Sequence, residues 1–370
     1  MSRPQRTDHG LASDLYRRGR GALLQARLGE AQELLEATLA AEPEHPEARQ
    51  DLAWAYYRGN DFASAADAFD GREASGAMVA KLRSFAAEPP YGVPGSERAT
   101  LPFLISEPLP LVRINVEGRD ICVLLDTGGA ELILDTEFAQ EIGVRLFGSQ
   151  EGVFAGGKRD SFDHGRVERV ALGEVQLERV PVHVLPTRRF SPVTGGRYQI
   201  EGIIGTNLLA QFRATLDYPA ERLVLEPADA PEHVAGVTVP FETLGDHYMI
   251  ADQGWLNGVG PQKFFVDSGL AGGAFTCPKR TLKSAGIPVP ETADRGGVGG
   301  GGGPVRTGVF QIDELGLGRL RQRDLVGVYI EPAGDAPADR DERWDGLISH
   351  GFLRKYRWTI DFAKSVFVFA

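Results

Sequence analysis

The segment EGIIGTNLLAQFRATLDY, residues Glu201–Tyr218, recurs later in the chain as DGLISHGFLRKYRWTIDF, residues Asp345–Phe362. The two align without gaps, with six identical positions and five exchanges of one apolar or aromatic residue for another. Upstream, LLDTGGAELIL (124–134) is matched by FFVDSGLAGGAF (264–275), and the offsets between landmarks stay between 141 and 145 residues. A nearly constant offset over separate landmarks predicts one ancestral unit, roughly 125 residues long, present twice.

Both copies have a sequence pattern typical of β strands. Short apolar runs are separated by Gly and Asp turns, and LVRINVEGRDICVLLD (111–126) predicts a hairpin around its Glu-Gly-Arg turn. We therefore predict two all-β lobes in one chain, covering residues 102–228 and 237–370.

An Asp stands at the same place in each copy, Asp126 after Val-Leu-Leu and Asp267 after Phe-Phe-Val. Burying one ionised carboxylate is costly, and two lobes related by a pseudo-two-fold axis would bring the two carboxylates face to face. Two carboxylates in contact cannot both ionise easily, so the pair shares a proton. Such a pair can take a proton from water and give one to a carbonyl oxygen. We predict that Asp126 and Asp267 are the catalytic residues.

The residues after each Asp predict how the loops are held. The hydroxyls of Thr127 and Ser268 are placed to hydrogen-bond across the lobe interface. Gly128 and Gly269 let backbone N–H groups approach the carboxylates closely. We expect these four residues to support the pair.

This pair of Asp-Thr/Ser-Gly loops, each followed by an apolar-apolar-Gly segment and a helix, resembles the pepsin and retropepsin clan of aspartic peptidases. The segment GIIGTNLLAQFRATLDY is similar to the corresponding stretch of retroviral proteases. The resemblance covers about 102–370 and implies a closed β fold in each lobe and a cleft between them. It also implies an aspartic endopeptidase that hydrolyses polypeptide substrates with an activated water and needs no cofactor.

The chain departs from retroviral proteases at the lobe interface. Those enzymes place an Arg after Ile-Ile-Gly and pair it with an acid four residues past the catalytic Asp. The positions concerned are Thr206 and Ala130 in the first copy, and His350 and Ala271 in the second. The resemblance therefore implies that another set of contacts holds the interface.

Three further departures lie close to the Asp pair. Ser349 replaces the family Gly in the second copy, which puts the geometry of that loop in question. Gly129 and Leu270 stand where pepsins carry a hydroxyl that hydrogen-bonds the carboxylate. Fewer hydrogen bonds to the charged form should raise the pKa values of the pair and favour work nearer neutral pH.

Two glycine-rich segments at matching places in the copies, 153–162 and 296–305, are candidates for the flaps that close over a bound peptide. For the second, a flexible polyglycine linker is an equal alternative. The glycines expected in the flaps are Gly156, Gly157, Gly299 and Gly300.

Residues 11–87 differ from the rest in being rich in Ala, Leu, Arg and Glu with helical spacing. They carry a 34-residue echo that superposes Gly19 on Ala53 and Leu35 on Phe69. This pattern resembles tetratricopeptide repeats and implies a possible protein partner. A third helix, about 72–87, is expected to cap the pair, and the Pro- and Gly-rich residues 88–101 predict a linker. The predicted fold class is thus multidomain, an all-α repeat domain followed by a duplicated all-β acid-protease fold.

Composition argues against several other classes of protein. The net charge is −11 without a Lys/Arg block, which argues against a nucleic-acid partner. No apolar run is long enough to span a membrane and no signal peptide is evident, so we expect a cytoplasmic protein. Cys122 and Cys277 lie in unrelated apolar contexts, and the His residues form no ligand pair, so we predict no metal site.

Two alternatives to an active peptidase stay open. The chain could be a protease-like adaptor that binds polypeptide without cutting it, or a purely structural β protein. A retained Asp in both copies favours the peptidase, because a buried pair of carboxylates without a role would cost stability. Asp217 and Asp361 also recur in the two copies, and for these we expect turn capping rather than catalysis.

Overall fold

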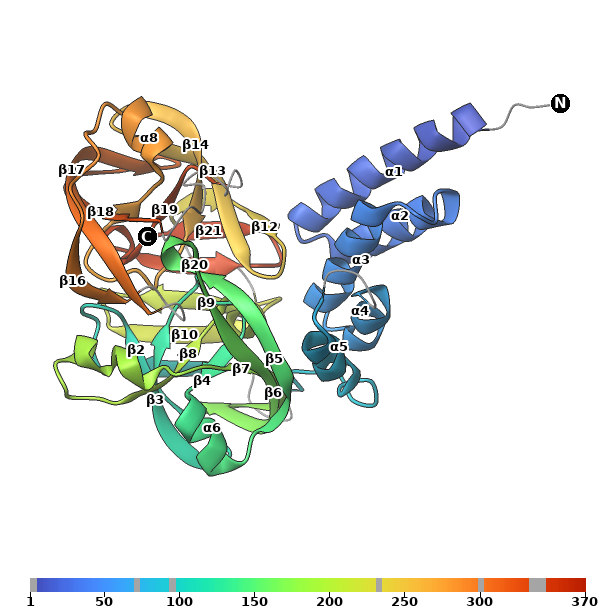
Figure 1. The fold of residues 1–370 in the computed structure, drawn as a ribbon, viewed down its shortest axis with the longest axis horizontal. Coiled ribbons are helices and arrows are strands. Elements are labelled where there is room, and N and C mark those ends of the chain that lie inside the picture. Colours follow the sequence, from blue (N-terminus) through green and yellow to red (C-terminus); the bar gives the residue numbers. More distant parts are fainter. Residues whose placement is uncertain (1–4, 70–73, 93–97, 231–234, 299–302, 333–343) are drawn as a thin grey trace.

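The computed structural model describes residues 5–69, 74–92, 98–230, 235–298, 303–332 and 344–370. A group of helices stands beside a two-lobed β body, with the second lobe above the first in Figure 1. None of the described helices is long and apolar enough to cross a membrane.

The N-terminal helices form two consecutive helix pairs and a fifth element that covers them. The first pair is α1 (Gln5–Leu24) with α2 (Leu28–Ala41), and the second is α3 (Pro46–Arg58) with α4 (Phe62–Phe69). A Cβ atom at Gly19 would lie 2.9 Å from Leu35 Cγ, so the small residue allows the first pair to pack closely. The capping helix α5 (Gly76–Arg83) begins later and ends earlier than the predicted helix 72–87.

Lobe 1 is built on a seven-stranded sheet in the order β2-β3-β8-β4-β7-β6-β5. Its strands are β2 (Leu111–Val116), β3 (Arg119–Leu125), β4 (Leu132–Leu134), β5 (Arg145–Phe154), β6 (Lys158–Leu172), β7 (Val175–Val184) and β8 (Ile200–Ile204). Helices α6 (Thr136–Ile142) and α7 (Thr206–Leu209) follow β4 and β8. The predicted hairpin at 111–126 is confirmed, because β2 and β3 pair around Glu117 and Gly118, both with positive φ.

Lobe 2 repeats this arrangement in an eight-stranded sheet ordered β12-β13-β14-β19-β15-β18-β17-β16. Its strands are β12 (Glu242–Leu244), β13 (Tyr248–Leu256), β14 (Val259–Val266), β15 (Phe275–Thr276), β16 (Ala293–Val298), β17 (Pro304–Leu317), β18 (Leu320–Ile330) and β19 (Gly346–Ile348). Helices α8 (Lys279–Ser284) and α9 (His350–Leu353) occupy the places of α6 and α7. From β14 to β16 the strand order matches that from β3 to β5, which confirms the duplicated all-β fold.

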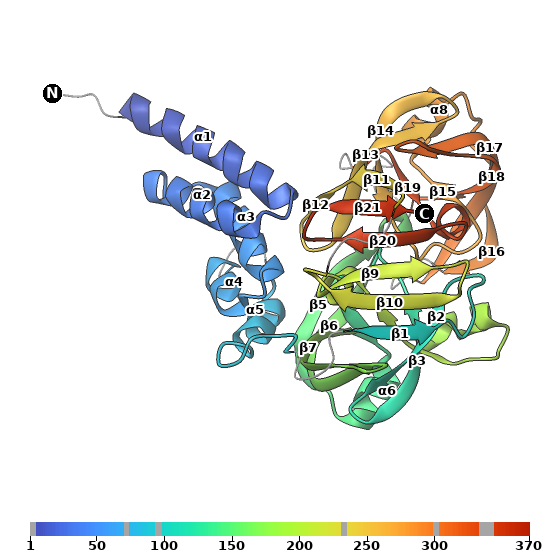
Figure 2. The same cartoon turned by 180° about the vertical axis from the view of Figure 1, so that it is seen from behind.

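A third sheet joins the lobes behind the body as seen in Figure 1 and faces the viewer in Figure 2. Its order is β1-β10-β9-β20-β21-β11, from β1 (Ala99–Pro102), β9 (Phe212–Asp217), β10 (Arg222–Pro227), β11 (Val237–Pro240), β20 (Arg357–Asp361) and β21 (Val366–Phe369). The central strands β9 and β20 pair, and Thr215 Oγ1 lies 2.7 Å from Thr359 Oγ1. These two threonines are equivalent in the two copies, so the pseudo-two-fold axis passes between them.

The start of lobe 1 differs from the sequence-based boundary. Strand β1 begins at Ala99, inside the segment 88–101 predicted as a linker, and Gly92 forms a β-bridge with Glu178. A four-residue strand that ends in Pro and pairs with a distant partner gives no local periodicity to detect. The capping role expected for Asp217 and Asp361 is confirmed, because their carboxylates accept hydrogen bonds from the N–H groups of Ala220 and Lys364.

Candidate active site

The two predicted catalytic residues begin equivalent loops at the ends of β3 and β14. The Asp126 N–H donates to the Ile204 carbonyl of β8, and the Asp267 N–H donates to the Ile348 carbonyl of β19, each at 3.0 Å. Because β8 and β19 run parallel to β3 and β14, each Asp is held at the same height in its own sheet.

Thr127 and Ser268 lock the two loops together with reciprocal hydrogen bonds. The Thr127 N–H donates to Ser268 Oγ at 3.1 Å, and the Ser268 N–H donates to Thr127 Oγ1 at 3.0 Å. Each hydroxyl then donates to a backbone carbonyl of the opposite lobe, Thr127 to Val266 and Ser268 to Leu125. Both side chains are completely buried, so the lobes are joined directly under the Asp pair.

The structure brings the carboxylates of Asp126 and Asp267 together. The Gly128 N–H donates to Asp126 Oδ1 at 2.8 Å, and the Gly269 N–H donates to Asp267 Oδ1 at 2.7 Å. A Cβ atom at Gly128 would lie 2.5 Å from Asp267 Oδ2, and one at Gly269 would lie 2.1 Å from Asp126 Cγ. Each glycine therefore makes room for the carboxylate of the other lobe.

Electrostatics distinguish this pair from ordinary surface acids. Burial of its carboxyl among protein atoms raises the pKa of Asp267 well above its ordinary value, and the Asp126 carboxylate raises it further. Hydrogen bonds from the Gly269 and Gly128 N–H groups oppose that shift without cancelling it. Both Asp residues remain partly exposed, so solvent can reach the pair.

The missing Arg–acid pair is replaced by two unlike sets of contacts. In lobe 1, Thr206 Oγ1 donates to the Thr127 carbonyl at 2.9 Å. In lobe 2, Ser349 Oγ donates to the Asp267 carbonyl at 2.6 Å and accepts from the Leu270 N–H at 3.0 Å. The sequence left the geometry of this loop in question because Ser349 replaces a glycine. In the structure Ser349 is one of the groups that hold the loop in place.

The interface also gains an ion pair between the lobes. His350 Nε2 lies 3.2 Å from Glu107 Oε2, and the Arg354 guanidinium donates to the same carboxylate. Glu107 precedes β2 of lobe 1, while His350 and Arg354 belong to α9 or its end in lobe 2. This contact takes over the α9 position at which retroviral enzymes would use their Arg.

A histidine that the sequence did not single out touches the lobe 1 loop. His247 lies in the turn between β12 and β13, and its Nε2 is 3.0 Å from the Gly128 carbonyl. Its Nδ1 is 2.6 Å from Asp246 Oδ1. Although burial raises the pKa of Asp246, His247 holds it below its ordinary value. Lobe 2 therefore supports the lobe 1 loop from outside the duplicated motif.

The predicted flap glycines of lobe 1 lie at the tip of the β5–β6 hairpin. Gly156 and Gly157 both have φ of 74°, and a Cβ at Gly156 would lie 3.2 Å from Ile330 Cγ2 of lobe 2. The hairpin thus reaches across to β18, as a flap would. Gly299 and Gly300 lie outside the described residues, between the paired strands β16 and β17.

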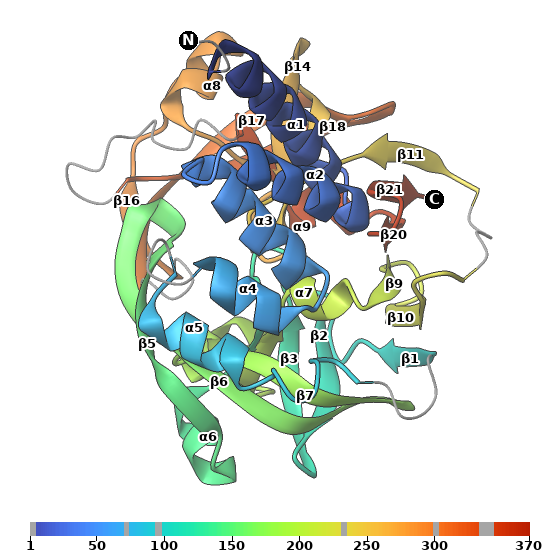
Figure 3. The ribbon, with the colours of Figure 1, turned by 90° about the vertical axis from the view of Figure 1, so that its right-hand side faces the viewer.

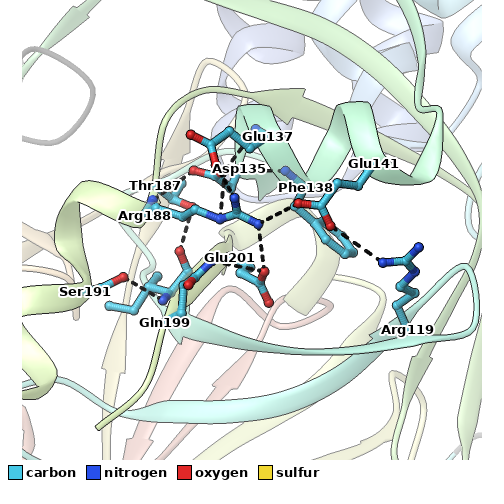
Figure 4. Close-up of polar contacts among 11 residues, drawn as sticks. Arg119, Asp135, Glu137, Phe138, Glu141, Thr187, Arg188, Ser191, Gln199 and Glu201 are labelled. Carbon is cyan, nitrogen blue, oxygen red and sulfur yellow. Dashed lines mark hydrogen bonds and ion pairs between the residues drawn. The ribbon is translucent and has the colours of Figure 1, made fainter. Parts of the chain in front are cut away.

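An arginine network fastens the connection between β7 and β8 in lobe 1 (Figure 4). The guanidinium of Arg188 contacts four carboxylates, those of Asp135, Glu137, Glu141 and Glu201. Asp135 also caps α6 by accepting from the Glu137 N–H at 2.9 Å. Because β8 carries the carbonyl that holds Asp126, this network stabilises the strand beneath the site. No local pattern in the sequence predicts it, since Arg188 lies between β7 and β8 and about fifty residues after α6, whose N-cap and helix supply three of the acids.

Comparison with protein families agrees with this geometry. The sequence model of the family described as Aspartyl protease matches residues 112–208 and again 253–351, together more than half of the chain. The chain belongs to the aspartyl protease family. In its N-terminal part, residues 22–82 match the family described as Tetratricopeptide repeat.

Among solved structures, the chain is similar to a retropepsin-like aspartic protease from Rickettsia conorii. The two share 17% sequence identity, and the alignment covers 36% of this chain and 92% of that one, with a TM-score of 0.25. No curated protein matches the chain.

Proposed function

We propose that this protein is an active endopeptidase that hydrolyses polypeptides with a water molecule held between Asp126 and Asp267. The observation that carries the proposal is the pair of facing carboxylates on loops locked by Thr127 and Ser268. Those hydrogen bonds hold two acids in contact in an arrangement that costs stability, which is expected of a site kept for chemistry.

The mechanism follows from a single shared proton. The ionised carboxylate removes a proton from the water, and the water oxygen attacks the carbonyl carbon of the substrate amide. At the same time the protonated carboxyl gives its proton to the carbonyl oxygen, so the tetrahedral intermediate is neutral. In its collapse one hydroxyl of the intermediate returns a proton to the ionised carboxylate as the C–N bond breaks, and the protonated carboxyl gives its proton to the leaving amine. The pair again holds one proton, as at the start.

The test is removal of each carboxylate with little change in shape. Asp126→Asn and Asp267→Asn should each lower peptide hydrolysis by about 10²- to 10⁴-fold, measured as kcat/KM on a peptide library. The matched control is Asp217→Asn, which alters a turn-capping carboxylate in lobe 1 and should keep activity. Peptide binding without cleavage by the wild type would favour the adaptor instead.

The thermal stability of Asp267→Asn at different pH values gives a second test. Because the folded-state pKa of Asp267 is raised, its carboxyl contributes stability below its unfolded pKa of about 4. That contribution is lost as pH rises through the folded value. The melting temperature of Asp267→Asn should therefore equal or exceed that of the wild type at neutral pH and fall behind it in acid. A difference that does not change with pH would contradict a shared proton.

A further inference from the structure

The helical domain contacts the protease lobes beside the candidate active site, not at a remote surface. Figure 3 shows α3, α4 and α5 lying in front of the lobes, near α7. The Asn207 side-chain amide of α7 donates to Tyr57 Oη of α3 at 3.2 Å, and the Asn60 amide donates to Gln211 Oε1 at 2.9 Å. The helices therefore touch the segment that directly follows β8.

A buried ion pair forms the centre of this contact. Glu131 lies five residues after Asp126 in the lobe 1 loop, and it is completely inaccessible to solvent. Lys81 Nζ of α5 donates to both of its carboxylate oxygens, at 2.6 and 2.7 Å. The Tyr57 hydroxyl donates to one of them as well, and His183 Nε2 lies 3.5 Å from the other. The helical domain thus supplies the only ammonium among these partners.

The position of Glu131 ties this pair to the loop that carries Asp126. The Thr206 N–H donates to the Gly129 carbonyl at 2.8 Å, and the Asn207 N–H donates to the Ala130 carbonyl at 2.7 Å. Thr206 in turn donates its hydroxyl to the Thr127 carbonyl. Ala130 is therefore joined directly to two residues that the helical domain contacts, to Glu131 by a peptide bond and to Asn207 by a hydrogen bond. Thr127 and Gly129 are held by Thr206, which precedes Asn207 in α7.

The ion pair is too costly to be an incidental contact. Lys81 is fully buried, and burial lowers the pKa of its ammonium while the Glu131 carboxylate opposes that shift. Removing either partner would leave an uncompensated charge in the interior. The stability of the buried Lys81 charge therefore depends on Glu131, and that of Glu131 on Lys81, although the two residues lie in different domains.

The same helix also holds the flap hairpin. Ser75, the N-cap of α5, donates to Gln150 Oε1 of β5 at 2.7 Å, and a Cβ at Gly148 would lie 3.2 Å from Ala77 Cβ. The Arg166 guanidinium of β6 donates to the Ser84 carbonyl at 2.7 Å and lies over the Phe85 ring. Helix α5 is thus fixed to the β5–β6 hairpin on one side and to the Asp126 loop on the other.

We propose that the helical domain is part of the active site, in which Lys81 is a positioning residue that holds the Asp126 loop through Glu131. This inference rests on the proposed peptidase function, because it states how that site is held in register with its flap. Lys81 acts on the reaction through the loop and does not touch the substrate.

The first experiment changes Lys81→Met in the full-length chain. We expect kcat for a peptide substrate to fall about 10- to 100-fold with little change in KM, because the loop is misplaced while the cleft remains. Hydrogen–deuterium exchange should become faster in the segments 126–134 and 203–209. The matched control is Arg83→Met, which removes a charge from the same helix at a side chain that is 53% exposed, and which should leave both readouts unchanged.

A second variant, Lys81→Met with Glu131→Gln, covers the case in which the single change prevents folding. It removes both buried charges, and the amide oxygen introduced by Glu131→Gln can still accept a hydrogen bond from Tyr57, so the protein should fold. We expect kcat to stay lowered and exchange in 126–134 to stay raised. Wild-type kcat in this double variant, or a lowered kcat with unchanged exchange in the loop, overturns the proposal.

The exchange measurement separates the two proposals. It needs no turnover, so it reports on the loop even if the wild type does not cleave peptides. Faster loop exchange in the Lys81 variants of a protein without hydrolytic activity would contradict the peptidase and leave the structural link standing. If the wild type cleaves peptides but loop exchange is the same with and without Lys81, the structural link is contradicted and the peptidase proposal stands.

Discussion

In lobe 1 the fifth residue after the Asp is Glu131, buried beneath the helical domain and paired with Lys81. In lobe 2 the same position is Gly272, exposed and with φ of 82°. Beneath these positions the loops are nearly the same, since Thr127 and Ser268 exchange equivalent hydrogen bonds. The comparison teaches that the contacts on the pseudo-two-fold axis stay symmetric, while the outer sides of the loops have diverged to meet different neighbours.

The short helices after the two Ile-Gly-like segments show the same divergence. In lobe 1, α7 is held by Tyr57 and Asn60 of the helical domain. In lobe 2, α9 is held by Glu107, which comes from the segment before β2. Each helix is thus anchored by a part of the chain outside its own lobe, α7 by the helical repeats and α9 by the segment before β2.

The largest expected effect on stability comes from substituting the fifth residue after the Asp in each loop. Glu131→Gln leaves Lys81 buried without a counter-charge and should lower the free energy of unfolding by about 3–5 kcal/mol. Gly272→Asn should change it by less than about 1 kcal/mol, because a Cβ there meets nothing within 4 Å and Asn tolerates positive φ. Chemical denaturation of both variants measures the difference. Equal losses would mean that the two loops are not supported differently.

A smaller effect tests the part that is symmetric. Gly128→Ala places a Cβ 2.5 Å from Asp267 Oδ2, so it should displace that carboxylate and lower kcat/KM about 100-fold. Gly129→Ala is the matched control, since its Cβ would come no closer than 3.6 Å to any neighbour. Lobe 2 already carries Leu270 at the position equivalent to Gly129. Similar activity in the two variants would contradict face-to-face carboxylates.

The smallest effect concerns the anchor of α9. Burial raises the pKa of Glu107, but hydrogen bonds from Arg354 and His350 hold that pKa below its ordinary value. Its carboxylate thus stabilises the fold above the unfolded pKa, and that contribution disappears as pH falls through the folded pKa. The side chain is 55% exposed, so Glu107→Gln should cost less than about 1 kcal/mol at neutral pH and nothing in strong acid. Thermal melts at both pH values would show whether this difference exists.

Sequence alone was sufficient for the features that the duplication repeats. The two Asp loops, the β2–β3 hairpin and the helical repeats all have local patterns, and the comparison between copies supplied the pairing of Asp126 with Asp267. Strand β1 was missed because its pairing with β10 depends on residues more than a hundred positions away. A short strand of this kind is defined by its partner and not by its own periodicity.

The contacts around Glu131 could not be predicted for a related reason. Lys81 and Tyr57 are single residues in amphipathic helices, where a Lys is ordinarily a solvated side chain. One signal was present, an acid in lobe 1 at the position where the other copy has a glycine. A difference between two copies of a duplicated loop indicates where one copy has gained a neighbour, although it does not name that neighbour.

The sheet that joins the lobes has a consequence for the order of folding. Strands within each lobe sheet pair with partners in the same copy, whereas Thr215 and Thr359 meet across 144 residues of chain. Closing so long a loop is entropically unfavourable and slow compared with local pairing, and domains generally fold as units. Each lobe can therefore form before the shared sheet does. The two carboxylates meet only at that last step, so a partly folded chain has no complete site, and hydrolytic activity should appear later in refolding than the β structure of either lobe.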